Sequence, residues 1–84
     1  MDRLEYELVT LYNGKQYFVL DSLMYEYDIY DLVLNVDDES DIKIVIQEIK
    51  NGKTVLNDVK DDYLLKTLSS MFKEKIEKKQ NDIN

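Results

Sequence analysis

The groups that could do chemistry in this sequence are carboxylates and hydroxyls, because its 84 residues include no His and no Cys. The serines therefore have no His to activate them as nucleophiles. A zinc site of the usual His and Cys ligands is excluded for the same reason. Both glycines follow Asn, in Asn13-Gly14 and Asn51-Gly52, which is typical of tight turns and not of a phosphate-binding loop.

The acidic loop 37–41 is the strongest metal candidate. Counted from its first residue, four oxygen ligands of an EF-hand would fall on Asp37, Glu39, Asp41 and Glu48. The glycine that the EF-hand loop needs for its sharp turn is replaced by Ile42, and strand-like sequence follows. We therefore expect a solvated loop with no metal ligands, and weak binding of Ca²⁺ or Mg²⁺ is the alternative.

Carboxylate pairs two residues apart, Glu5/Glu7 and Glu26/Asp28, would share one face of a strand. Acid–base catalysis needs one such group to have its pKa raised in a pocket, and glycosidases need a cleft that holds a sugar. A sheet covered by one helix is expected to offer no such cleft. We predict that the protein is not an enzyme and has no catalytic residue and no cofactor.

Tyrosines are abundant, and three of the seven fall in the segment 25–30, where acids alternate with them. Tyr is enriched at protein interfaces. This pattern predicts a partner-binding surface made of Tyr25, Glu26, Tyr27, Asp28, Tyr30 and Asp31. The alternative is that these tyrosines are ordinary strand residues, half-buried with their hydroxyls in water.

Charge is unevenly distributed along the chain, whose net charge is −7. Residues 1–41 hold 11 acids and 2 bases, and residues 42–84 hold 7 acids and 9 bases. The first half would repel phosphates, so direct nucleic-acid binding is not expected. A protein partner with a basic surface is expected instead, since complementary potentials speed and orient association.

Alternating and periodic apolar residues predict one α+β domain over residues 1–84. Strands are expected between about residues 5 and 57, a helix over about 61–79 and a frayed tail over 80–84. The strands would form a four- to five-stranded antiparallel meander, with the helix covering one face. We expect the other face to be uncovered and to support a homodimer or a docked protein, because it carries apolar side chains: Val9, Leu11, Val33, Val45 and Ile49.

The order of these elements resembles the YrzB-like domain-of-unknown-function family of small acidic bacterial proteins, over roughly residues 5–76. The resemblance is carried by segments 19–23 and 30–34, by the two Asn-Gly turns and by the Asp-led helix that ends near Met71-Phe72. The chain departs from the family at Tyr27-Asp28-Ile29, where a glycine is usual. The resemblance implies a bacterial cytosolic protein without an established activity, and it carries over no functional residue.

Three functions are compatible with this pattern. The first is a non-enzymatic acidic interaction module, acting as an adaptor or regulator. The second is a nucleic-acid mimic of the phage-inhibitor type, because acids that alternate along a strand lie ~6.6–6.8 Å apart, close to the spacing of successive phosphates. The third is a self-associating structural domain. With no apolar run of ~20 residues and no signal-peptide pattern, we expect a cytoplasmic protein that does not bind membranes.

Overall fold

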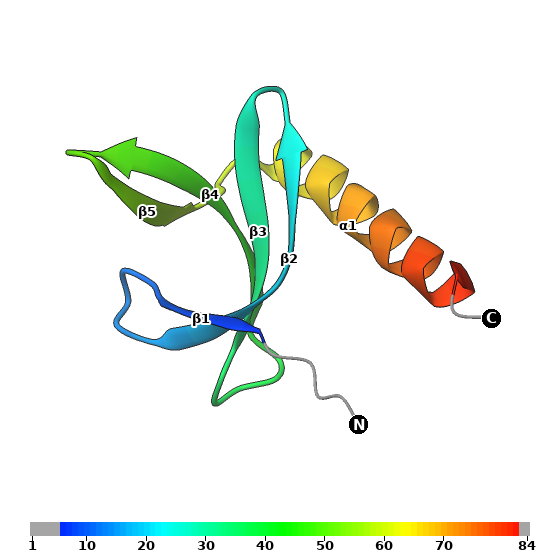
Figure 1. The fold of residues 1–84 in the computed structure, drawn as a ribbon, viewed down its shortest axis with the longest axis horizontal. Helices are drawn as coiled ribbons and strands as arrows, with labels where there is room; N and C mark the ends of the chain where they lie inside the picture. The colour runs from blue at the N-terminus through cyan, green and yellow to red at the C-terminus, as the bar shows by residue number, and fades with distance from the viewer. Residues whose placement is uncertain (1–5, 83–84) are drawn as a thin grey trace.

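Five strands and one helix make up the computed structural model, which describes residues 6–82 and side chains as far as residue 78. In chain order the elements are β1 (Glu7–Thr10), β2 (Gln16–Tyr25), β3 (Asp28–Asn35), β4 (Ile42–Lys50), β5 (Lys53–Asp58) and α1 (Asp62–Asp82). Each strand pairs antiparallel with the next, so the sheet order is β1-β2-β3-β4-β5 (Figure 1). The predicted α+β meander with a C-terminal helix is confirmed.

The helix α1 begins at Asp62, close to the predicted start at about residue 61. The Asp61 carboxylate accepts hydrogen bonds from the backbone N–H groups of Tyr63 at 2.9 Å and Leu64 at 3.1 Å, which caps the first turn. The helix continues to Asp82, so the prediction that the chain frays from residue 80 is wrong for residues 80–82. Residues 83–84 lie outside the described part. Within residues 6–82, no helix has the length and apolar character needed to cross a membrane.

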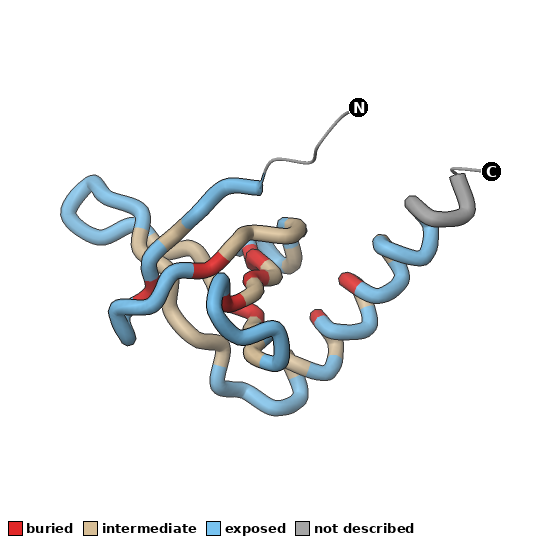
Figure 2. Tube along the Cα trace, turned by 90° about the horizontal axis from the view of Figure 1, so that it is seen from below, coloured by how far each residue is buried: buried red, intermediate tan, exposed pale blue. Residues whose placement is uncertain are grey.

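One face of the sheet packs against α1, as predicted. Tyr30 and Ile44 from the sheet are buried against Leu68 and Phe72 from the helix. The buried helix residues lie on the side of α1 that faces the sheet (Figure 2). These residues follow the strand period of two and the helical period of three to four, which is why a sheet covered by one helix could be predicted from the sequence.

The opposite face of the sheet is concave. The prediction that this face is uncovered is wrong. The β1–β2 and β4–β5 hairpins both curl away from the helix and close over this face (Figure 1). A second core forms beneath them from Leu11, Tyr17, Val33 and Val45, with Val9, Val19 and Leu56 packed around it. The sheet's twist brings its two edges toward each other, which hydropathy along the chain does not reveal. Homodimerisation through this face stays a prediction, but most of the apolar residues that were predicted to form its interface are part of the second core.

A β-bulge at Leu20 explains part of this curl. Val19 pairs with Val33, but Asp21 pairs with Leu32, so β2 contains one extra residue. Before the bulge, the side chains of Tyr17 and Val19 join the concave core, and after it Leu23 packs on the helix side. Bulges bend a strand and increase its local twist. The bulge thus lets β2 contribute to both cores.

Candidate functional site

The segment predicted to bind a partner forms the β2–β3 hairpin, and the structure divides its six residues. Tyr27 is 97% exposed at the turn, where Glu26 and Asp28 are exposed as well. Tyr30 and Asp31 are only 4% and 3% exposed and lie on opposite faces of the sheet. Tyr25 is half-buried against the helix-side core. An interface at the hairpin tip can therefore use the three turn residues directly, whereas the other three are half-buried or buried.

The hairpin turn has unusual backbone geometry for its sequence. Tyr25 pairs with Asp28, which leaves Glu26 and Tyr27 as the two turn residues, and their φ angles are +50° and +74°. A two-residue hairpin of this type needs positive φ at both positions, which favours Asn and Gly. Positive φ costs an ordinary residue roughly 1–2 kcal/mol. The turn is tight, because β2 continues to Tyr25 and β3 begins at Asp28.

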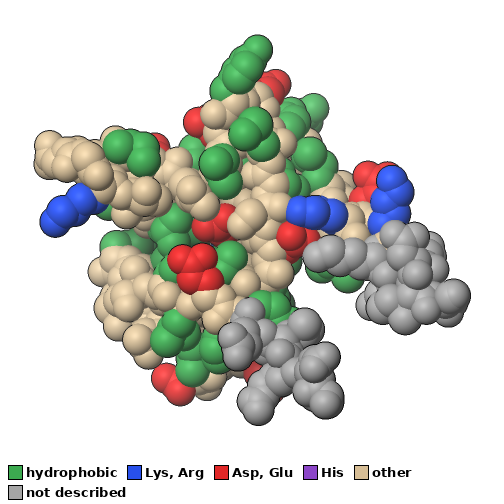
Figure 3. Space-filling view, viewed as in Figure 1, with side chains coloured by type: hydrophobic (Ala, Val, Ile, Leu, Met, Phe, Trp, Pro, Cys, Tyr) green, Lys and Arg blue, Asp and Glu red, His purple; other side chains and the backbone are tan. Residues whose placement is uncertain are grey.

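Apolar side chains surround the turn on the concave side of the sheet. Met24 and Ile29 are cross-strand partners, and Met24 is 66% exposed. Ile49, near the end of β4, is 71% exposed. Figure 3 shows apolar groups gathered over the β2–β3 hairpin, with carboxylates beside them. We name the tip surface by its members: Met24, Glu26, Tyr27, Asp28, Ile29 and Ile49.

A shallow depression joins the two parts of the tip surface. It has a volume of about 640 Å³ and lies between the hairpin turn and the last residues of β4, from Gln47 to Lys50. Burial raises the pKa of Tyr30, and the negative charges of Asp28 and Glu26 raise it further. The exposed acids Glu26 and Asp28 thus lie beside the apolar side chains of the tip surface, and Lys50 lines the depression together with Asp28.

The acidic loop 37–41 directs two of its carboxylates into hydrogen bonds with the protein. Asp41 Oδ2 accepts from the Tyr17 hydroxyl at 2.7 Å and from Asn35 Nδ2 at 3.0 Å, and these bonds lower the pKa of Asp41. The hydroxyl of Ser40 donates to Asp38 at 2.7 Å, and this bond, with one from the Ser40 N–H, lowers the pKa of Asp38. These bonds shape the loop.

The EF-hand positions are not brought together as ligands. Glu48 lies on β4 and accepts a hydrogen bond from Asn57 of β5. No group of three or more potential metal-binding side chains occurs in the part of the chain that the structure describes. Of the carboxylate pairs, Glu26/Asp28 lies exposed at the hairpin turn, and Glu5 lies outside the described residues.

Asp31 is the one candidate residue that points into the concave face, at the centre of the sheet. Its Oδ1 accepts a hydrogen bond from Ser22 Oγ at 2.6 Å, and Gln47 Nε2 donates to Oδ1 at 3.1 Å and to Oδ2 at 3.0 Å. Ser22 comes from β2 and Gln47 from β4, on either side of Asp31. We call these three residues the Asp31 cluster. Its donors are neutral, so it buries a carboxylate without a matching cation.

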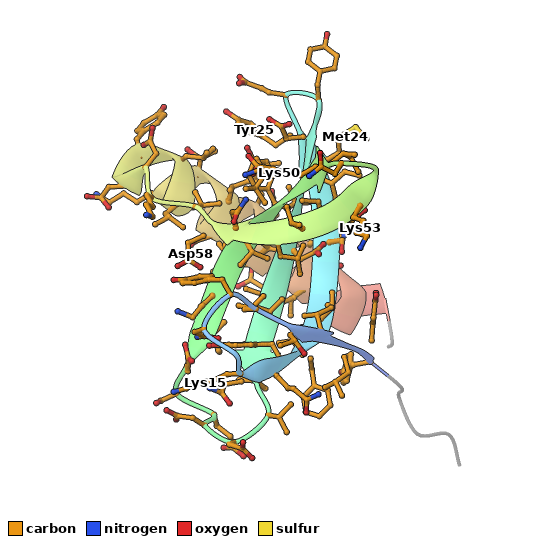
Figure 4. The ribbon with its side chains drawn as sticks, turned by 90° about the vertical axis from the view of Figure 1, so that its left-hand side faces the viewer. Lys15, Met24, Tyr25, Lys50, Lys53 and Asp58 are labelled. Carbon is orange, nitrogen blue, oxygen red and sulfur yellow. The ribbon has the colours of Figure 1, made fainter. Side chains whose placement is uncertain are left out.

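A groove lies in front of the Asp31 cluster, between the two edge strands of the curled sheet. Its volume is about 770 Å³, and it is lined by residues of β1 and β5 together with Asp31 and Gln47. Figure 4 looks onto this face, with the β4–β5 hairpin and its Lys50 and Lys53 above, and β1 below. Tyr12 closes one end by donating a 2.5 Å hydrogen bond to Asp58 Oδ2, and this bond raises the pKa of Tyr12. The sequence pattern did not predict this groove, which lies between the two edge strands of the curled sheet.

The sequence analysis missed the partners of Asp31. A polar residue between apolar ones normally marks a solvent face, so the pattern around Asp31 and Gln47 indicates exposure to water and not a contact. Ser22 was not considered as a partner. The available signal was that polar residues occur on three successive strands near one level, which is a pattern that only the strand register turns into a cluster.

Comparisons with protein-family models, with curated proteins and with solved structures found no match to this chain. The resemblance to the YrzB-like family therefore stays a prediction, and the assignment of function rests on the geometry described above.

Proposed function

We propose that the protein is a non-enzymatic interaction module, an adaptor or regulator, that binds a basic protein partner through the tip surface. A bacterial, cytoplasmic setting belongs to the same proposal, and it rests on the sequence pattern alone. The proposal narrows the predicted interface from six residues to the exposed turn and the apolar residues beside it. Tyr30 and Asp31 are buried and do not belong to the tip surface.

The observation that carries the proposal is the strained turn that presents Tyr27. Glu26 and Tyr27 both have positive φ, although neither residue type favours it, and Tyr27 is almost fully exposed. Strain of this kind is concentrated at functional sites, where the surrounding structure holds it in place. An exposed Tyr on the same tip surface as the exposed apolar residues Met24, Ile29 and Ile49 has the composition of an interface hot spot.

The expected partner combines a basic rim with an apolar pocket. Glu26 and Asp28 flank Tyr27 at the tip, so a partner with Lys or Arg around its pocket would complement both parts of the surface. The apolar contacts should provide affinity, and the charges should provide orientation and speed. Binding is therefore expected to weaken in salt without being abolished by it.

Affinity capture with the wild-type chain and with Tyr27→Ser tests the proposal. We expect the wild type to retain a protein from lysate that Tyr27→Ser loses, and the recovered protein to bind the purified wild type at least about tenfold more tightly than the variant. Tyr63→Ser is the matched control, because Tyr63 is also exposed but lies at the start of α1. Equal retention by all three chains would reject the tip surface as the interface.

A further inference from the structure

The Asp31 carboxylate has unused capacity for a ligand. An ionised carboxylate accepts about four hydrogen bonds. Among the residues that the structure describes, Ser22 and Gln47 donate to Asp31, and the one donor to its Oδ2, from Gln47, is shared with Oδ1. The ion pairs among the described side chains are Lys43–Asp41 and Lys75–Asp21, and neither involves Asp31. Burying a carboxylate without a cation is costly, so a positive group brought to Asp31 would gain a strong, desolvated partner.

The walls of the groove offer backbone groups for pairing. β1 and β5 are the edge strands, so each has one side without a strand partner. The residues that flank a two-residue turn, here Lys50 and Lys53, form a pair that exchanges both backbone hydrogen bonds. Along the two strands from this pair, non-hydrogen-bonded and hydrogen-bonded pairs then alternate. The N–H groups of Thr54 and Leu56 consequently point away from β4. Both residues line the groove in front of Asp31.

We propose that the β1–β5 groove binds an extended, basic peptide segment of a partner protein, which adds a strand to the edge of β5 and places one Lys or Arg side chain on Asp31. A strand added to an exposed edge gains affinity from main-chain bonds and specificity from alternate side chains. The groove volume of about 770 Å³ is within the range of peptide and ligand sites. A free amine could meet Asp31 but would leave the edge of β5 unpaired, which is why a peptide is the occupant we choose.

Selection from a random heptapeptide library displayed on phage, against the full chain, tests this proposal. We expect the enriched peptides to share a Lys or Arg at one position and to bind Asp31→Asn at least about tenfold more weakly. Replacing that Lys or Arg by norleucine should cause a similar loss. Amide chemical shifts of the labelled protein should change in β5 and around Asp31.

Variants that leave Asp31 intact keep the test decisive if Asp31→Asn folds poorly. Thr54→Pro removes a backbone donor that faces the groove, and Pro is tolerated at such edge positions. Thr54→Pro should weaken the binding of the selected peptides, whereas Thr54→Val should not. Tyr27→Ser should bind these peptides as tightly as the wild type does. A failure of the groove proposal can therefore be distinguished from a failure of the proposal that the tip surface binds a partner. Peptides that lack a basic residue, that bind Asp31→Asn equally or that shift the tip residues would overturn the proposal.

Discussion

Two hairpins of this protein use the same turn geometry with opposite kinds of residues. The β4–β5 hairpin turns through Asn51 and Gly52, with φ angles of +53° and +77°. The β2–β3 hairpin turns through Glu26 and Tyr27, with φ angles of +50° and +74°. Asn and Gly adopt this conformation readily, whereas Glu and Tyr do so at a cost.

The difference indicates what each turn is for. The β4–β5 turn is built from the residues that stabilise it, so its role can be purely structural. The β2–β3 turn gives up stability to hold an acid and a Tyr at an exposed apex, and the long paired strands β2 and β3 keep it in that shape. Loss of stability at a site commonly accompanies function.

The largest effect on stability is expected from giving the β4–β5 turn the residues of the other turn. The variant Asn51→Glu/Gly52→Tyr should lose about 2 kcal/mol of unfolding free energy, because both residues are then strained. Nothing lies within 4 Å of a Cβ placed at Gly52, so the loss would report backbone strain and not a clash. Urea denaturation measures it. An unchanged midpoint would show that the geometry costs little in this sheet.

The reverse exchange should stabilise the protein. Glu26→Asn/Tyr27→Gly places the favoured residues at the strained turn, and we expect a gain of about 1–2 kcal/mol. That gain corresponds to an increase in Tm of roughly 4–16 °C for a domain of this size. Thermal unfolding followed by circular dichroism measures it. A lower Tm would mean that Glu26 or Tyr27 makes contacts that outweigh the strain.

The loop between β3 and β4 provides a third connection, which is held by side-chain hydrogen bonds. Because the pKa of Asp41 is lower in the folded state, its contribution to stability is present above the ordinary pKa of about 3.9 and is lost as pH falls through the folded value. Asp41→Asn should therefore be less stable than wild type at pH 7, and the difference should shrink below about pH 4. Urea midpoints at the two pH values test this. A difference independent of pH would contradict it.

The smallest effect is expected at the base of the β2–β3 hairpin, where α1 holds β2. Lys75 Nζ lies 2.9 Å from Asp21 Oδ1 and also donates to the carbonyl of Ser22. Lys75→Met should cost about 0.5–1 kcal/mol and keep the aliphatic stem in place. The cost should decrease in 1 M NaCl because salt screens the pair. A loss that is insensitive to salt would assign the effect to packing.

The sequence predicted what depends on local pattern. The strands, the C-terminal helix and its packing on one face of the sheet follow from periodicity and residue type, and they are confirmed. The Asn51-Gly52 turn was recognised for the same reason, while the Glu26-Tyr27 turn carries no such signal. Tertiary features were missed. The curl that buries Val33 and Val45, and the register that places Asp31 beside Ser22 and Gln47, depend on how strands meet and not on any one segment.

The central claim is that the strain at Glu26-Tyr27 is retained for binding. One paired measurement on Glu26→Asn/Tyr27→Gly tests it: the free energy of unfolding, and the affinity for the protein that the wild-type chain captures. We predict that this variant is more stable than the wild type and that its affinity falls at least about tenfold. A variant that is more stable and still binds the partner as tightly as the wild type would contradict the account.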